Sequence, residues 1–101
     1  MSKYHAVKTD GYASKAEAKR AMELKLLARV GEIRELLEQV PFQLIPKQDE
    51  ERAVLYIADF VYIDAKGNQV VEDVKGFKTP EYVIKRKLMR FLYGIKIREV
   101  A

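Results

Sequence analysis

Asp73 and Lys75 are the first residues whose types and spacing suggest chemistry. They lie in the segment VVEDVKGFKTP, residues 70–80, whose valines are typical of a buried strand. Successive side chains of a strand point to opposite faces, so this carboxylate and this ammonium project side by side, while Glu72 points to the other face. The alternative is an edge strand with an exposed ion pair, which would contribute ~0–1 kcal/mol. The other charged groups that reach this face decide between the two interpretations.

Asp59 is the second acid to explain. It lies in the segment AVLYIADFVYID, residues 53–64, the clearest strand of the sequence. Strand alternation places it on one otherwise aliphatic face, with Leu55, Ile57, Val61 and Ile63. An isolated buried carboxylate costs several kcal/mol, so Asp59 needs a partner or a metal ion. If the next loop is residues 65–67, with Gly67 in the left-handed conformation, Asp59 lies opposite Asp73, whereas a two-residue loop would break this parity.

Glu17 is the third acid, on a helix predicted over residues 14–31. It follows the N-cap Ser14 by three residues, so a capping box explains it by itself. It also extends the stripe Ala21, Leu24 and Ala28, which should pack on the sheet near the other acids. Carboxylates ~4 Å apart repel by about 4 kcal/mol per pair at an effective dielectric of about 20. Because Mg²⁺ or Mn²⁺ binds such oxygens, we expect a divalent-metal site; a structural ion-pair network with Lys75 is the alternative.

The elements that must position these residues follow the order α-β-β-β-α-β. After the first helix, strands are predicted at residues 32–46, at 53–64 and at the start of 70–80. Thr79 and Pro80 begin a second helix that ends at Tyr93, with Gly94 after it, and residues 95–100 form a short last strand. The first three strands form an antiparallel meander and a helical crossover delivers the last. The predicted fold is α/β, a mixed sheet flanked by helices.

Length and composition set the class of protein. The 101 residues predict a single domain, 1–101, whose residues 1–13 form an N-terminal arm. The absence of cysteine excludes disulfides, thiolate zinc sites and a cysteine nucleophile. No apolar run is long enough to span a bilayer and no signal peptide is visible, so we expect a cytoplasmic protein without membrane contact. Basic ends surround an acidic middle, residues 31–74, which suits a polyanion partner and a cation site; ordinary solvated charge is the alternative.

These features together resemble the PD-(D/E)XK nuclease superfamily. Its pattern is a helix with S-x-x-E, an acid on the central strand and acid-x-Lys on the next strand, within a restriction-endonuclease-like α-β-β-β-α-β core. The segments DGYASKAEAKRAMELKLL, LEQVPFQLIP, YIADFVY, VVEDVKG and YVIKRKL are more closely similar to a family of short phage and prophage proteins. That family was long catalogued as an uncharacterised domain and is grouped with Holliday-junction resolvases. The resemblance covers nearly the whole chain, although Ala58 replaces the proline of the superfamily's name and the third acid is Asp rather than Glu.

The resemblance implies a catalytic role for four residues. Glu17 matches the helix glutamate, Asp59 the strand aspartate, Asp73 the motif acid and Lys75 the motif lysine. Asp59 and Asp73, with Glu17, would then hold Mg²⁺ or Mn²⁺ for phosphodiester hydrolysis. Lys75 would orient the attacking water or stabilise charge on the phosphate. Two residues of the first strand, Glu38 and Gln39, are further candidates to line this site.

The second helix is expected to face the substrate. Its apolar residues predict a core stripe of Ile84, Leu88, Phe91 and Leu92. The outer side, which also carries Tyr93, would be basic and aromatic and would suit phosphates. The predicted DNA-binding residues are Lys78, just before the helix, and Tyr82, Lys85, Arg86 and Arg90. A solvated helix face is the alternative.

The sequence therefore predicts a metal-dependent, structure-selective DNA endonuclease, and more specifically a phage Holliday-junction resolvase that acts on branched or duplex DNA in a bacterial host cell. The alternatives are a non-catalytic DNA-binding module of the same fold, a general DNA nicking nuclease and a structural or virion-assembly protein. Met22 and Leu26, apolar residues on the outer side of the first helix, favour a homodimer. Burial of this side by the N-terminal arm is the alternative.

Overall fold

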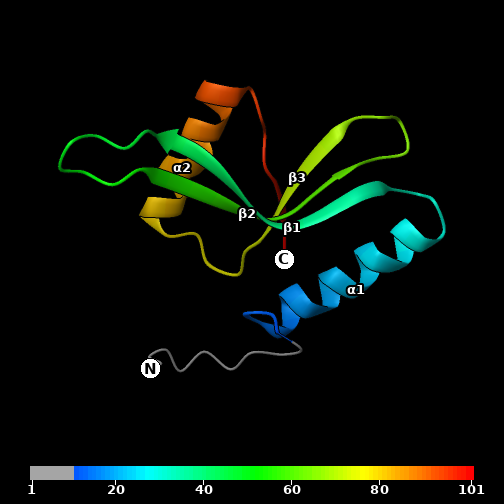
Figure 1. The fold of residues 1–101 in the computed structure, drawn as a ribbon. Helices are drawn as coiled ribbons and strands as arrows, with labels where there is room; N and C mark the ends of the chain where they lie inside the picture. Colours follow the sequence, from blue (N-terminus) through cyan, green and yellow to red (C-terminus); the bar gives the residue numbers. More distant parts are fainter. Residues whose placement is uncertain (1–10) are drawn as a thin grey trace.

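The structure, a computed structural model, describes residues 11–101, which form two helices and four strands (Figure 1). The elements are α1 (Lys15–Arg29), β1 (Arg34–Ile45), β2 (Val54–Ile63), β3 (Gln69–Val74), α2 (Pro80–Tyr93) and β4 (Arg98–Val100). The predicted order and the α/β class are confirmed. Most of the predicted arm, residues 1–13, lies outside the described residues.

The four strands form one mixed sheet in the order β1-β2-β3-β4. The first three are antiparallel neighbours, and β4 lies parallel to β3 after the crossover through α2, as predicted. In the β2–β3 hairpin Phe60 pairs with Glu72, a register that brings Asp59 opposite Asp73. Gly67 has a φ of 86°, the left-handed conformation expected for the loop. The register predicted for the two acids is therefore confirmed.

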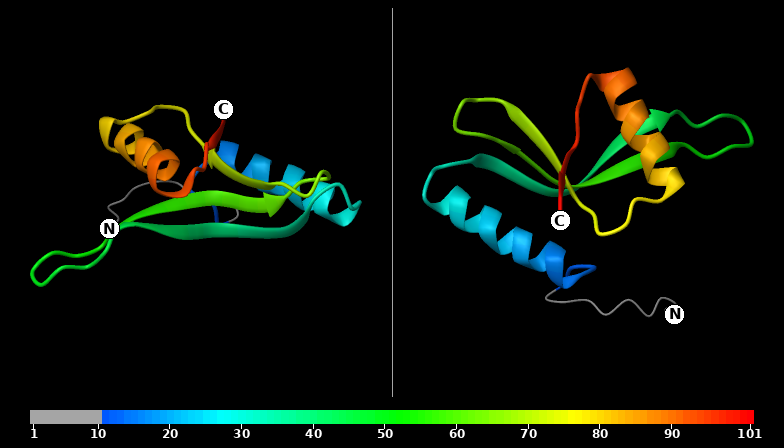
Figure 2. Two further views of the ribbon diagram at one scale, coloured as in Figure 1. Left: turned by 90° about the horizontal axis from the view of Figure 1, so that it is seen from above. Right: turned by 180° about the vertical axis from the view of Figure 1, so that it is seen from behind.

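The core face of β2 changes along its length. Tyr56 and Ala58 are buried, whereas Leu55 and Ile57 are exposed. After Asp59 both faces are covered, and the buried residues there are Phe60, Val61 and Tyr62. The residues from Leu55 to Ile63 alternate as predicted, but the expectation that their shared face is buried is wrong for the first half of the strand. The reason is that α1 and α2 lie along different halves of a strongly twisted sheet, so each half buries a different side (Figures 1 and 2).

Helix α1 agrees with the sequence prediction at both its start and its core side. The Ser14 hydroxyl accepts a hydrogen bond from the Glu17 N–H at 3.1 Å, as in the expected cap. Glu17, Ala21 and Leu24 are buried. The opposite side leaves an apolar stripe exposed, at Met22, Leu26 and Val30.

Helix α2 turns a different side to the core from the predicted one. Tyr82 and Met89 are buried, whereas Ile84 is exposed and Phe91 is 83% exposed. Of the predicted stripe, only Leu88 packs partly against the core. The prediction was wrong because both sides of this helix carry apolar residues at helical spacing, and the spacing by itself does not show which side meets the sheet.

The core consists of two clusters, one around each helix. One packs α2 against the sheet around Tyr56, Val71 and Met89, and the other packs α1 around Leu24 and Phe60. No helix within residues 11–101 is long and apolar enough to cross a membrane. Asp59 lies on β2 between Ala58 of the first cluster and Phe60 of the second.

Candidate active site

The candidate site lies where β3 separates from β2. Backbone pairing ends at Phe60 and Glu72, and one residue further the Asp59 carboxylate accepts a hydrogen bond from the Val74 N–H at 2.8 Å. The side chain thus satisfies a donor that the diverging strands leave without a backbone partner. The next N–H, that of Lys75, donates to a carbonyl of β4 at 2.9 Å. Asp59 and β4 together hold the segment from Asp73 to Lys75 in place.

Gln39 joins Asp59 to Glu17 on the α1 side of this junction. It stands opposite Asp59 in the β1–β2 register, and its Nε2 donates to Glu17 Oε2 at 3.0 Å and to Asp59 Oδ1 at 3.3 Å. Its φ of 55° lies in the left-handed region, which costs a residue other than glycine about 1–3 kcal/mol. This strained backbone places an amide between two carboxylates.

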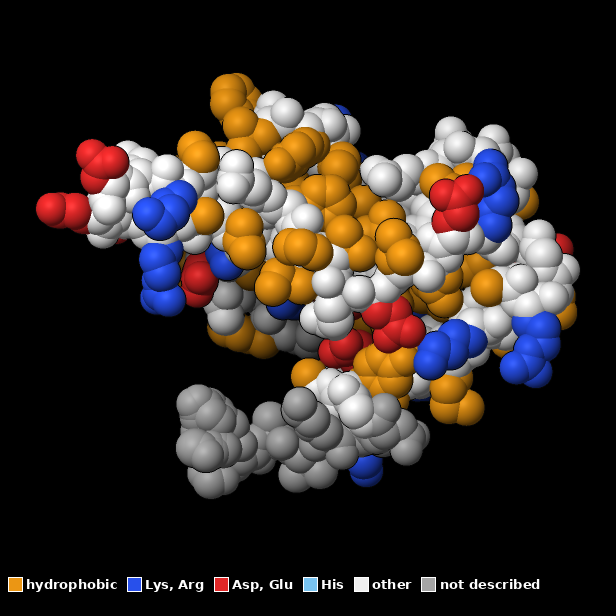
Figure 3. Space-filling view, in the orientation of Figure 1, with side chains coloured by type: hydrophobic (Ala, Val, Ile, Leu, Met, Phe, Trp, Pro, Cys, Tyr) orange, Lys and Arg blue, Asp and Glu red, His pale blue; other side chains and the backbone are white. Residues whose placement is uncertain are grey.

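An open cavity of about 560 Å³ lies in front of these residues. Glu17, Gln39 and Asp59 line it together with Glu38 and residues 11–13. Figure 3 shows acidic side chains gathered on this face, between the start of α1 and the sheet. The structure therefore brings both first-strand candidates, Glu38 and Gln39, to the same cavity as two of the predicted acids.

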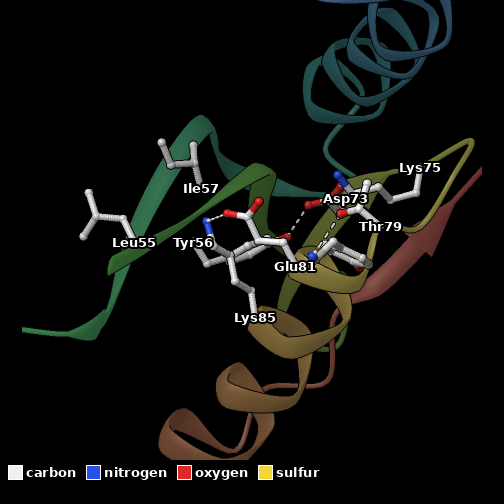
Figure 4. Close-up of a pocket in the computed structure, with 9 residues that line it drawn as sticks. Leu55, Tyr56, Ile57, Asp73, Lys75, Thr79, Glu81 and Lys85 are labelled. Carbon is white, nitrogen blue, oxygen red and sulfur yellow. Dashed lines mark hydrogen bonds and ion pairs between the residues drawn. The ribbon is translucent and has the colours of Figure 1, made fainter. Parts of the chain in front are cut away.

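Asp73 lines a second cavity, of about 320 Å³, towards α2 (Figure 4). Its Oδ2 accepts a hydrogen bond from the Tyr56 hydroxyl at 2.5 Å, and Lys75 Nζ lies 3.4 Å from Oδ1. The same ammonium lies 4.5 Å from the centroid of the Tyr82 ring, within cation–π range. The Lys75 contact lacks hydrogen-bond geometry, so the buried Oδ1 has no hydrogen-bond partner among the described residues. Asp73 thus has one oxygen held by a hydrogen bond and one that meets only the Lys75 ammonium among the described residues.

Burial and neighbouring charge raise the pKa of two of the acids. Burial raises the pKa of Glu17, which is 7% exposed, and the negative charge of Asp59 raises it further. Burial also raises the pKa of Asp73; the Tyr56 hydrogen bond opposes this rise, while the charge of Asp59 adds to it. The three carboxylates therefore repel one another across the junction, although Glu17 and Asp59 line one cavity and Asp73 the other.

The residues available to a divalent cation are two carboxylates. Asp59 and Asp73 contribute carboxylate oxygens from adjacent strands, and Asp73 Oδ1 lacks a hydrogen-bond partner within the described chain. Across residues 11–101 no group of three His, Asp or Glu side chains converges closely enough to hold a metal ion unaided. Mg²⁺ commonly uses one or two carboxylates and keeps several waters, so a divalent-metal site on Asp59 and Asp73 stays a prediction.

Glu72, the neighbour of Asp73, points to the opposite face of β3, as predicted, and is fully buried. Arg20 donates to both of its oxygens, through Nε at 2.8 Å and Nη2 at 2.7 Å, and the Tyr62 hydroxyl donates as well. Burial alone would raise the pKa of Glu72, but the hydrogen bonds from Arg20 and Tyr62 lower it below its ordinary value. Because Arg20 follows Glu17 by about one helical turn, this ion pair fixes the part of α1 that carries Glu17.

The predicted DNA-binding residues do not form one outer surface. Tyr82 is buried, because its ring packs into the core and its hydroxyl donates to Glu99 at 2.7 Å. The expectation that Tyr82 lies on the outer side of the helix is therefore wrong. Glu99 also pairs with Lys78 and Arg86, each at 3.0 Å. The hydrogen bonds from Tyr82 and Lys78, with that from Arg86, lower the pKa of Glu99 to about 2.

Lys85 and Arg90 lie on different parts of α2. Lys85 lines the cavity of Asp73, where its Nζ pairs with Glu81 at 3.4 Å (Figure 4). Arg90 is exposed near the end of the helix and lines another cavity. Of the five residues, Lys85 and Tyr82 therefore border the cavity of Asp73, and the other three lie beyond it.

Sequence reasoning missed Tyr56 and Glu99. Alternation assigns Tyr56 to the face opposite Asp59, and only the change of face along β2 makes it a partner of Asp73. Glu99 is the one acid of the basic segment IKIREV, which is a weak signal. Its importance depends on the β3–β4 register, which sets it beside Asp73 and which the sequence does not show.

Comparison with known proteins assigns the chain to a family. The chain belongs to the family described as "Protein of unknown function (DUF1064)", whose model matches residues 1–100. This description agrees with the expected relatives, catalogued as an uncharacterised domain, while the wider nuclease assignment stays a prediction. No match was found among curated proteins or among solved structures.

Proposed function

We propose that this protein is a metal-dependent DNA endonuclease of PD-(D/E)XK type. The observation that carries the proposal is the junction of β2 and β3, where Asp59, Asp73 and Lys75 meet and one buried Asp73 oxygen has no hydrogen-bond partner among the described residues. The Lys75 ammonium, 3.4 Å from that oxygen, is its charged partner among the described residues, and a carboxylate oxygen without a hydrogen bond can also bind a cation.

Each residue of the site has a role in phosphodiester hydrolysis. Asp59 and Asp73 would hold Mg²⁺ or Mn²⁺, which would supply Lewis-acid polarisation of the phosphate and a water of lowered pKa. Lys75 places its ammonium beside Asp73 and stabilises negative charge on the scissile phosphate. Glu17, held by Gln39, positions the attacking water. The hydrogen bond from the Tyr56 hydroxyl to Oδ2 fixes the orientation of the Asp73 carboxylate, and Oδ1 lies on the side away from Tyr56.

The specific proposal is a Holliday-junction resolvase of phage or prophage origin that acts on branched DNA in the bacterial cytoplasm, as a homodimer. The basic residues around α2 support a polyanionic substrate. The second candidate is a non-catalytic DNA-binding module of the same fold. The absence of a three-residue metal cluster within residues 11–101 is the observation that favours it.

Cleavage of linear, forked and four-way DNA, with Mg²⁺ and with chelator, tests this proposal. We expect metal-dependent cleavage of the four-way junction by the wild type and none by Asp73→Asn. Asp49→Asn, in the exposed β1–β2 turn, is the matched control and should cleave normally. Cleavage of linear duplex as fast as junctions would indicate a general nicking nuclease. Binding of DNA without cleavage in the presence of any metal ion would favour the non-catalytic DNA-binding module.

A further inference from the structure

A second basic cavity lies apart from the acidic junction, on the side of α2 towards the C-terminus. It has a volume of about 310 Å³ and opens between α2 and the segment that leads from α2 into β4. This segment turns back along the sheet beside the helix, as Figure 2 shows from behind. The cations that line the cavity are Arg86, Lys87, Arg90 and Lys96.

The charge of this cavity is mostly uncompensated. Glu99 is its one acidic lining residue, and it pairs with Arg86 at 3.0 Å. Lys87, Arg90 and Lys96 make no ion pair with any residue in the described part of the chain. Three free cations around one small cavity repel one another unless an anion joins them. Such an arrangement favours the binding of a polyanion.

The floor of the cavity is apolar and fixed. Ile95 and Ile97 line it, and Ile97 is 5% exposed. Gly94, with a φ of 68°, closes α2, and the Ile95 N–H donates to the Met89 carbonyl at 3.3 Å. A rigid apolar floor under a basic rim suits a sugar–phosphate unit, whose phosphate meets Arg and Lys while the sugar lies on the apolar side chains. An acidic peptide would also meet these charges; the cations that continue from this cavity through Arg86 and Lys78 towards Lys75 favour a nucleic-acid strand.

Glu99 connects this cavity with the candidate active site. Its carboxylate binds the Tyr82 hydroxyl and Arg86 through Oε2, and Lys78 through Oε1. Tyr82 in turn lies under the Lys75 ammonium. Positive side chains therefore continue from Lys75 past Lys78 and Arg86 to the second cavity.

We propose that this cavity is a second phosphate-binding site that holds the backbone of a nucleic-acid strand at a distance from the bond being cut. Lys87 and Lys96, which are not among the predicted DNA-binding residues, are its principal new contacts. The inference rests on the proposed function only for the identity of the ligand, because binding at this cavity needs neither metal nor Lys75.

Fluorescence anisotropy with a labelled DNA duplex, in chelator so that no strand is cut, tests the proposal. The test variant is Lys87→Glu with Lys96→Glu. The control is Lys19→Glu with Lys66→Glu, which makes the same change of charge at exposed lysines on α1 and in the β2–β3 loop. Each phosphate contact contributes about 0.9 to the slope of log affinity against log salt concentration. This amounts to roughly eightfold in affinity at 0.1 M salt relative to 1 M. We expect the test variant to lose at least tenfold in affinity and about two units of salt slope, and the control to lose less than threefold.

Two further arms identify the ligand. Inorganic phosphate at matched ionic strength should displace the duplex only weakly, and a poly-glutamate peptide should bind with an affinity that does not distinguish test from control. Equal loss of DNA affinity in test and control overturns the inference, and so does specific displacement by free phosphate or by the peptide. Circular dichroism checks the fold, and Lys87→Gln with Lys96→Gln replaces any variant that fails to fold. Charge-specific binding without any cleavage would overturn the proposed function alone, whereas cleavage without charge-specific binding would overturn this inference alone.

Discussion

One carboxylate oxygen of Asp59 accepts a hydrogen bond from the Val74 N–H, at 2.8 Å, at the point where β3 leaves β2. The other oxygen has only the Gln39 amide, at 3.3 Å, so one oxygen holds the fold and the other is weakly engaged. An asparagine at this position keeps an acceptor for Val74 and removes the charge. Asp59→Asn therefore removes the charge and keeps the Val74 contact, while its NH₂ group replaces the oxygen that accepts from Gln39.

The first prediction concerns the metal. Because a cation relieves the repulsion among Glu17, Asp59 and Asp73, Mg²⁺ or Mn²⁺ should stabilise the wild type, by about 2.7 kcal/mol at one hundred times its Kd. For a domain of this size that is a rise in Tm of roughly 10–20 °C. Thermal melts should show that Asp59→Asn and Asp73→Asn lose this rise and are at least as stable as the wild type without metal. If both variants respond to metal as the wild type does, the site has been placed on the wrong residues.

The second prediction separates chemistry from binding at Lys75. Its ammonium lies beside Asp73 and over the Tyr82 ring, so Lys75→Ala should abolish cleavage. One lost phosphate contact among many changes the salt slope by only about 1, so affinity for DNA should fall by less than about tenfold. Cleavage assays and anisotropy on the same protein measure both effects. Arg86→Ala with Arg90→Ala is the comparison and should weaken binding more; a similar loss of binding in both would favour a module without a catalytic centre.

The sequence predicts the order of the elements and the partners across the hairpin because these depend on local signals. Ser14, Gly67 and Gly94 fix a cap, a turn and a helix end by their own conformational preferences, and the loop length then sets Asp59 opposite Asp73. Which face of β2 or α2 is buried depends instead on how the two helices pack on the sheet. Ile84 and Phe91 were misplaced for that reason, and Tyr82 with them.

The third prediction concerns the buried pair of Arg20 and Glu72. Removal of one partner of a buried pair typically costs 3–5 kcal/mol, and the remaining contacts of Arg20 with Glu23 and of Glu72 with Tyr62 should reduce this cost. Arg20→Met or Glu72→Met alone should therefore destabilise strongly in urea unfolding, while the double variant recovers much of the loss. Arg29→Met, at the exposed end of α1, is the control and should change stability little. Additive losses in the double variant would contradict the coupling.

The fourth prediction is a pH dependence from Glu99. Its pKa is about 2 in the folded protein against an ordinary value of 4.5, because Tyr82, Lys78 and Arg86 bind the carboxylate. The folded state releases the proton more readily than the unfolded state, so this stability is complete above pH 4.5 and is lost as the pH falls towards about 2. Glu99→Gln should lower Tm at neutral pH, and its difference from the wild type should shrink across this window. A difference that stays constant down to pH 2 would show that the carboxylate charge is not the cause.

The last prediction concerns assembly. A four-way junction needs two cuts on opposing strands, and one chain offers one acidic junction, so a two-fold pair of chains matches the symmetry of the substrate. Met22, Leu26 and Val30 recur every four residues on the outer side of α1 and are 68%, 58% and 62% exposed, which is the surface we expect a second copy to cover. Sedimentation equilibrium at micromolar protein should show a dimer for the wild type and a monomer for Leu26→Lys. Leu92→Lys makes the same change at a half-exposed leucine of α2 and should remain dimeric.

In junction assays the dimer should make paired nicks, while Leu26→Lys should make single, uncoupled nicks, because two active sites are no longer held together. A wild type that is monomeric with and without junction DNA, and that nicks linear duplex as readily, would overturn both the dimer and the resolvase proposal and would leave a general nuclease.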